Sequence, residues 1–194
     1  MTIQDIIGAA LASNRPTVFV KGLQTVLPDE CVFAGDGTTI VSECPDNCGI
    51  TFAGLNQQDD HLPTDGVGNV LASPQWIADT YFSSYWQSVS ELLPTPLNIL
   101  IFVQAVNQGD YAEGKILQFT LNRIAGARLV IDGRIGPQTA QAAMSYPDTN
   151  GLCKAFLADS KTYYQNVVTN HPSDQKFLDG WDNRIDSLQA EFCT

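Results

Sequence analysis

Residues Leu97 to Val106, which read LNILIFVQAV, form the longest apolar run in this chain of 194 residues. The run is shorter than the roughly 18–20 apolar residues that a bilayer-spanning helix needs, so it predicts a buried helix and no membrane insertion. Thr95-Pro96 is a helix start signal in front of it, and Gly109 is a stop signal behind it. We therefore expect a core helix from Leu97 to about Asn107.

Helical spacing continues on both sides of this run. Apolar residues recur at i, i+3 and i+4 from Thr17 to Leu27, and Pro28 is expected to end that helix. Ser73-Pro74 offers an N-cap and a proline at the first helical position for a helix that reaches Trp86. The expected apolar stripe of that helix is Ile77, Tyr81 and Tyr85. Further helices are expected near Tyr111 to Ile124, after the Asp132 to Pro137 turn, from Leu152 to Val168, and from Asp182 to Phe192.

One short segment carries the pattern of β structure. Gly35-Asp36-Gly37 is typical of a turn, and the β-prone residues Thr38 to Val41 follow it, so a small hairpin is expected there. The length suits one sizeable core, and the chain shows no repeat or linker. The expected fold is therefore a mainly α, single compact domain over residues 1–194 with one small β-hairpin.

The net charge of −11 excludes several classes of partner. No Lys or Arg occurs from Gly22 to Gly114, whereas twelve acidic residues do, so the first half presents an acidic surface that would repel nucleic acid. No pattern in the chain implies a cofactor. The apolar segment Ile6 to Ala12 follows Asp5, where a secretory signal would carry a basic residue, so Sec export is not expected.

Five cysteines are many for a cytosolic protein, and they favour an oxidising compartment. Cys44 and Cys48 flank a turn that suits either a small disulfide loop or half of a zinc site, but no second Cys/His pair completes such a site. A bridge within this loop, or from Cys31 to one of its cysteines, would hold the hairpin in place. Cys153 and Cys193 lie at the ends of the last helical region and could tie down the C-terminus, which leaves one thiol free.

Several segments, taken in order, resemble glycoside hydrolase family 108 and the peptidoglycan-binding segment that follows its catalytic half. The resemblance covers residues 17 to 190, and its motifs are short. The matching segments are Phe19 to Glu30, Cys48-Gly49-Ile50-Thr51, Ile77 to Trp86, Leu93-Pro94, Phe102 with Ala105 to Gly109, Leu117-Gln118, Asp132 to Thr139, and Gly180 to Arg184. This resemblance implies a lysozyme-like helical fold, with a muramidase-like catalytic half at 17–96 and a helical, peptidoglycan-binding-like half at 97–192.

The resemblance implies an N-acetylmuramidase that hydrolyses the β-1,4 bond between N-acetylmuramic acid and N-acetylglucosamine. The family's catalytic glutamate, at the end of a helix, matches Glu30. A glycosidic oxygen leaves only when it is protonated, and partial burial at the C-terminal end of a helix favours a protonated carboxyl group. The second catalytic group is left open between Asp36, Glu43 and Asp46. Thr51 either orients water or sugar through its hydroxyl or packs as a strand residue.

Four residues are candidates for binding the sugar. Tyr85, Trp86 and Trp181 could stack on pyranose rings, although tyrosines at helical spacing are more commonly core residues. Asn107 lies near the end of the apolar helix, and the resemblance makes it a contact of substrate or hairpin. The expected partner is the peptidoglycan glycan strand, and the expected location is outside the cytoplasm, by a non-Sec route or by phage release.

Departures from the family pattern support a second hypothesis. Glu30 is followed by Cys31-Val32-Phe33 instead of Gly-Gly-Tyr, and Val103 stands where the family usually has Asp. A muramidase-derived module that binds glycan or a partner protein without cleaving it would tolerate these changes. Cys31 with His61 as a thiol-imidazole pair is a third alternative, but no orienting third group can be named.

Overall fold

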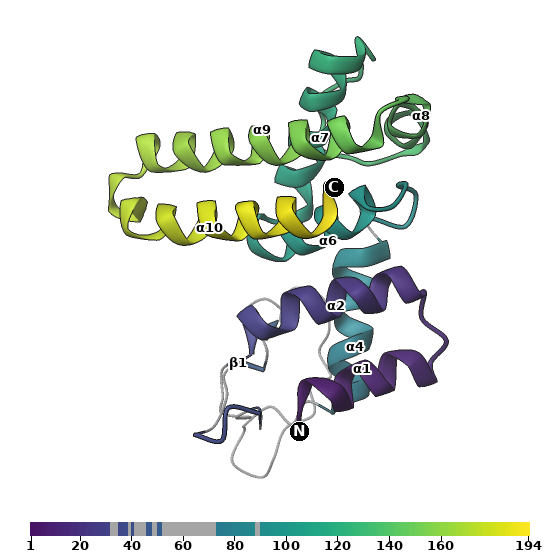
Figure 1. Ribbon diagram of the computed structural model, residues 1–194, viewed down its shortest axis with the longest axis vertical. Coiled ribbons are helices and arrows are strands. Elements are labelled where there is room, and N and C mark those ends of the chain that lie inside the picture. The colour runs from purple at the N-terminus through teal and green to yellow at the C-terminus, as the bar shows by residue number, and fades with distance from the viewer. Residues whose placement is uncertain (32–34, 39, 41–45, 48–49, 52–72, 88–89) are drawn as a thin grey trace. The chain divides into compact units, whose positions relative to one another are not determined.

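The computed structural model describes residues 1–31, 35–38, 40, 46–47, 50–51, 73–87 and 90–194, and the chain groups into two compact units (Figure 1). The N-terminal unit is Met1–Trp86 and the C-terminal unit is Gln87–Thr194. This division falls shortly before the expected 96/97 boundary, and the single compact domain stays a prediction. The expected mainly helical, lysozyme-like class is confirmed. Within the described residues, no helix has both the length and the apolar character needed to cross a membrane.

The N-terminal unit begins with helix α1 (Ile3–Ala12), which the sequence analysis did not predict. Thr2 and Asp5 form a capping box: the Asp5 N–H donates to Thr2 Oγ1 at 3.3 Å, and the Thr2 N–H donates to Asp5 Oδ2 at 2.7 Å. Ile6, Ile7 and Ala10 are buried. Asp5 therefore starts a helix whose apolar face contributes to the core of this unit.

Helix α2 (Thr17–Glu30) continues through Pro28, so the prediction that this proline ends the helix was wrong. Pro28 is exposed and removes a single backbone donor close to the helix end. One residue past the helix, the Cys31 N–H still donates to the Leu27 carbonyl at 3.0 Å. As a result, Glu30 is the last residue of the helix.

Helix α4 (Pro74–Tyr81) starts as expected, because Ser73 Oγ accepts a hydrogen bond from the Trp76 N–H at 3.1 Å. It runs into a π-helical turn, η1 (Phe82–Trp86), which adds one residue to the helical period. The residue that follows Tyr81 on the buried face is consequently Trp86, and the expected stripe position Tyr85 is only half-buried.

The described β structure is a two-stranded antiparallel hairpin of β1 (Asp46–Asn47) and β2 (Ile50–Thr51). It lies further along the chain than the expected strand, which falls partly outside the described residues. The expected turn is present: Gly37 has a φ of 69°, and the Thr38 N–H donates to Asp36 Oδ1 at 2.9 Å.

The C-terminal unit is built around helix α6 (Leu97–Gln108), whose residues from Leu97 to Ala105 are all buried, as expected for the core. Helix α7 packs against α6 and α9, and α10 packs against α9. The elements after α6 are α7 (Asp110–Ala125), α8 (Pro137–Ser145), α9 (Thr149–Asn170), the 3-10 turn η2 (Pro172–Asp174) and α10 (Gln175–Phe192). Helix α10 starts well before the expected Asp182. Its fully buried residues, Ile185 and Leu188, both lie in the second half, which is the part that was predicted.

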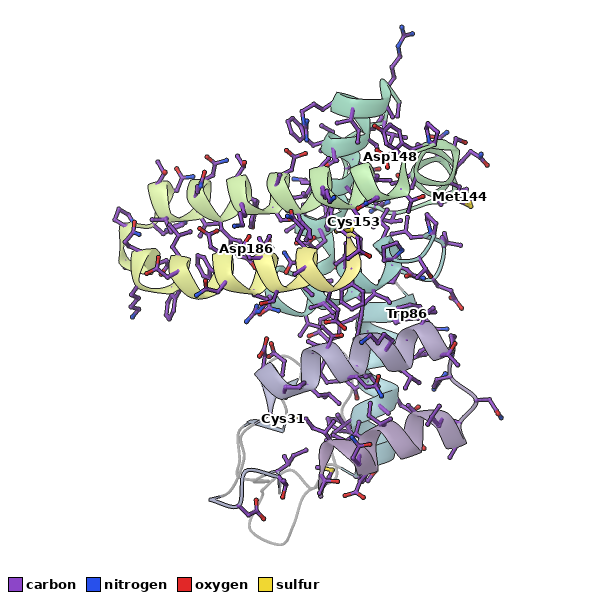
Figure 2. All side chains as sticks on the ribbon, viewed as in Figure 1. Cys31, Trp86, Met144, Asp148, Cys153 and Asp186 are labelled. Atoms are coloured by element: carbon purple, nitrogen blue, oxygen red, sulfur yellow. A yellow bond between two sulfur atoms is a disulfide. The ribbon has the colours of Figure 1, made fainter. Side chains whose placement is uncertain are left out.

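A disulfide joins Cys153, near the start of α9, to Cys193, directly after α10 (Figure 2). Their Cα atoms are 5.7 Å apart, within the usual range for a disulfide. The prediction that this pair ties down the C-terminus is confirmed. Cys31 is also disulfide-bonded, whereas Cys44 and Cys48 lie outside the described residues.

Candidate functional site

Glu30, the candidate general acid, closes helix α2 and is half-buried. At this position its carboxyl group lies by the carbonyl end of the helix, where the macrodipole disfavours a negative charge. The preceding residue, Asp29, is exposed. The local structure therefore distinguishes two neighbouring acids, of which only Glu30 is partly withdrawn from water.

The candidates for the second catalytic group are placed differently. Asp36 is exposed in the 35–38 turn, and one of its oxygens accepts the Thr38 N–H. Asp46 and Thr51 are cross-strand partners in the hairpin, so the register brings together two residues that the sequence could not relate. Glu43 and His61 lie outside the described residues.

The aromatic candidates of the N-terminal unit divide between core and surface. The Trp86 ring is only 1% exposed and lies edge-on to Phe19, with ring centroids 5.6 Å apart. It therefore serves the core of the unit in this conformation. Tyr85 is half-buried beside Tyr81, with centroids 5.8 Å apart, and is the better placed of the two candidates to meet a ligand.

Asn107 and Trp181 belong to different helices of the C-terminal unit, α6 and α10. Asn107 is exposed, and its Nδ2 donates to the Val103 carbonyl at 3.2 Å. Trp181 is half-buried and stacks on Tyr164, with centroids 4.6 Å apart and planes 18° from parallel. One face of the Trp181 indole is thus already covered by protein.

Gln118 organises the Asp132 to Thr139 motif. Its Nε2 donates to Asp132 Oδ1 at 2.8 Å and to the Arg134 carbonyl at 3.0 Å, and its Oε1 accepts the Gly133 N–H at 2.8 Å. The Arg134 N–H also donates to Asp132 Oδ1, at 2.9 Å. This bond, and then the one from Gln118, lower the pKa of Asp132. Both motifs can be read in the sequence, whereas the one buried amide that joins them is seen only in the structure.

Three helices form a buried polar cluster that was not predicted from the sequence: Gln108 on α6, Glu113 on α7 and Tyr164 on α9. Gln104, one turn before Gln108, is also buried. Within the described residues, none of the side-chain N and O atoms of these four residues has a hydrogen-bond partner of good geometry. Burial raises the pKa of Glu113 well above its ordinary value of 4.5. Burial, and then the nearby Glu113 charge, raise the pKa of Tyr164 to about 12, and the positive charge of Arg184, followed by the Gln108 side chain, opposes this shift. The sequence feature that could have predicted this cluster is the pair of glutamines, four residues apart, in an otherwise apolar helix.

In the described ranges, no group of three or more His, Cys, Asp or Glu side chains could hold a metal ion. The described chemical groups are a half-buried carboxyl at a helix end, the carboxylate of the 35–38 turn, and the amides and arginines of the C-terminal unit.

Part of the chain matches a known family model, and its fold is similar to that of a solved structure. Residues 114–186 match a family model described as "Predicted Peptidoglycan domain". The solved structure of SagA from Brucella abortus has a similar fold, with a TM-score of 0.68 and 19% sequence identity over 91% of this chain and 96% of that chain. No curated protein matches the chain. The matched domain lies entirely within the C-terminal unit and includes Gln118 and the motif that it organises.

Proposed function

We propose that this protein is a peptidoglycan hydrolase of the muramidase type, which cleaves the β-1,4 bond between N-acetylmuramic acid and N-acetylglucosamine. The observation that carries the proposal is the match of residues 114–186 to a peptidoglycan domain, which gives the C-terminal unit a cell-wall ligand. The half-buried Glu30 at the end of α2, in the N-terminal unit, provides the carboxylic acid that cleavage of a glycosidic bond requires. The enzyme acts outside the cytoplasm, where disulfides such as Cys153–Cys193 persist.

In this mechanism the Glu30 carboxyl donates its proton to the glycosidic oxygen as the bond from that oxygen to the anomeric carbon breaks. The leaving sugar departs with a free hydroxyl, and a water molecule adds to the anomeric carbon after losing a proton to a carboxylate. We assign that carboxylate to Asp46, because the hairpin register pairs it with Thr51, the other candidate of this hairpin. Asp36 suits the role less, since its carboxylate already accepts the Thr38 N–H.

The test is clearing of purified peptidoglycan by the wild-type protein and by Glu30→Gln. The variant keeps the size and hydrogen bonding of the side chain but has no proton to deliver, so the rate should fall by a factor on the order of 10²–10⁴. Asp29→Asn is the matched control, because it removes a neighbouring exposed carboxylate and should leave the rate unchanged. A Glu30→Gln variant that clears peptidoglycan as fast as wild type would refute the assignment.

The products separate hydrolysis from other outcomes. A muramidase leaves a reducing N-acetylmuramic acid end that borohydride reduces, and mass spectrometry of the released fragments detects this end. Asp46→Asn should lower the rate of release, whereas Asp36→Asn should change it little.

A non-catalytic module that binds cell-wall glycan or a partner protein is the second candidate. The residues at positions 31–33 and 103, which depart from the family pattern, favour it, and the net charge of −11 favours a partner protein over anionic cell wall as its ligand. Sedimentation with insoluble peptidoglycan without release of reducing ends would establish this function in place of hydrolysis.

A further inference from the structure

The C-terminal unit carries a groove between the end of α7, the following loop and α8. Its cavity volume is about 820 Å³, which is enough for a short peptide or a small oligosaccharide. A second hollow of about 530 Å³ adjoins it, and the two share Leu129, Pro137 and Gln138. Both lie within residues 114–186, so the groove belongs to the segment that matches a peptidoglycan domain.

The loop that forms one wall is held firmly on α7. The Asn122 side chain forms two hydrogen bonds with the backbone of Leu129: its Oδ1 accepts the Leu129 N–H at 2.6 Å, and its Nδ2 donates to the Leu129 carbonyl at 2.9 Å. Gln118 holds the next part of the loop in the same way, through Gly133 and Arg134. The groove is therefore formed before a ligand arrives, which lowers the entropy cost of binding.

The lining of the larger hollow is apolar and cationic. Small or apolar side chains dominate it, and Tyr146 is its one aromatic residue, so a sugar ring would find little flat surface on which to stack. Arg128 is its only charged residue. The apolar members of the lining are Ile124, Ala125, Ala127, Leu129, Pro137, Ala142 and Pro147.

Arg128 is exposed and takes part in no ion pair within the described part of the chain. Its φ of 56° lies in the left-handed region, which a non-glycine residue adopts only at a cost in free energy. Arg134, in the adjoining hollow, is likewise exposed, and its neighbour Asp132 is held by Gln118. The attraction for an anionic ligand is local to the larger hollow, because Arg128 is the one charged residue of its lining and no carboxylate belongs to that lining.

We propose that this groove binds the acidic stem peptide of peptidoglycan, with Arg128 pairing a free carboxylate and the apolar wall receiving the alanine methyl groups. The inference rests on the proposed function, because it specifies which part of the cell-wall polymer the C-terminal unit recognises. Stem peptides combine small alanine side chains with free carboxylates, and this combination complements both features of the lining. Arginine is suited to the contact because its planar guanidinium can bind a carboxylate through two parallel hydrogen bonds.

The test titrates the full chain with two separate probes: the free tetrapeptide L-Ala-γ-D-Glu-diaminopimelate-D-Ala, and glycan strands from which an amidase has removed all peptides. Isothermal calorimetry should show binding of the tetrapeptide. Arg128→Gln should weaken this binding about tenfold, the loss expected for one charge-assisted hydrogen-bonded contact. Lys154→Gln, which removes an exposed cation on α9, is the matched control and should leave the affinity unchanged.

The proposal is overturned if the peptide-free glycan binds and the tetrapeptide does not, if neither probe binds, or if Arg128→Gln binds the tetrapeptide as tightly as wild type. Circular dichroism of each variant verifies that it is folded.

A failure of the proposed catalytic function would give a different result from a failure of the groove proposal. Clearing of peptidoglycan that Glu30→Gln does not slow would refute the catalytic assignment. Tetrapeptide binding that depends on Arg128 would still support the groove in that case.

Discussion

Glu113→Gln should stabilise the C-terminal unit at neutral pH and remove a loss of stability that grows as the pH rises. Glu113 is fully buried on α7, and neither of its carboxylate oxygens has a hydrogen-bond partner within the described residues. Burial disfavours the charged form and raises its pKa well above 4.5. Tyr164, its neighbour in the cluster, has a pKa of about 12 and stays neutral throughout the range considered.

The sign follows from proton binding in the two states. Above pH 4.5 the unfolded chain releases the Glu113 proton while the folded chain keeps it, so the unfolded state binds fewer protons and the free energy of unfolding falls with pH. For one proton the slope is about 1.4 kcal/mol per pH unit, and it persists until the pH passes the raised folded pKa. For a unit of this size, this corresponds to a Tm change of about 6–11 °C per pH unit. Glutamine cannot ionise, so the variant lacks this contribution.

Urea unfolding followed by circular dichroism at pH 5, 6 and 7 measures this effect, and hydrogen exchange of α7 amides assigns it to the C-terminal unit. The free energy difference between Glu113→Gln and wild type should increase with each step in pH. Glu91→Gln makes the same chemical change at an exposed position and should follow the wild-type pH profile. Parallel profiles for Glu113→Gln and wild type would refute the reasoning, as would a variant less stable than wild type at pH 7.

Three further expectations concern the disulfide, the loop contact and the charge. Replacing Cys153 and Cys193 by serine should lower the free energy of unfolding by about 4 kcal/mol, since the bridge closes a segment with a sequence separation of 40 residues; urea unfolding measures the loss. Gly114→Ala should destabilise by about 1–3 kcal/mol, because the added methyl would collide with the backbone carbonyl of Gly133, and a thermal melt measures this. Gly180→Ala, where the methyl meets no atom, should instead gain about 0.5–1 kcal/mol from helix propensity, so that the difference between the two variants isolates the clash. Clearing of peptidoglycan should speed up with moderate salt and with acidification toward pH 4.3, as both reduce repulsion between an acidic protein and an anionic wall, and a rate independent of ionic strength would argue against this.

Local signals in the sequence predicted the elements whose boundaries depend on nearby residues. Ser73-Pro74 starts α4, and Gly109 ends α6 with a φ of 83°, as expected from a cap and a stop signal that act within one turn. The apolar run 97–106 placed the core helix of the C-terminal unit for the same reason, because burial follows directly from its composition. The pairing of Cys153 with Cys193 was predicted from their positions at the two ends of the last helical region.

Other features depend on contacts that no short stretch of sequence contains. Pro28 stays inside α2, where its ring is exposed to solvent. The π-helical turn places Trp86, and not the expected Tyr85, on the buried face of its helix. Glu113 follows Asp110 and Tyr111 in a polar stretch typical of an exposed helix start, yet packing of α7 against α6 and α9 buries it completely. The sequence by itself determined where most helices form, since capping and apolar periodicity are local. Only the tertiary structure decided which polar groups are buried, because the free-energy cost of burying them is offset by packing among residues that are distant in the chain.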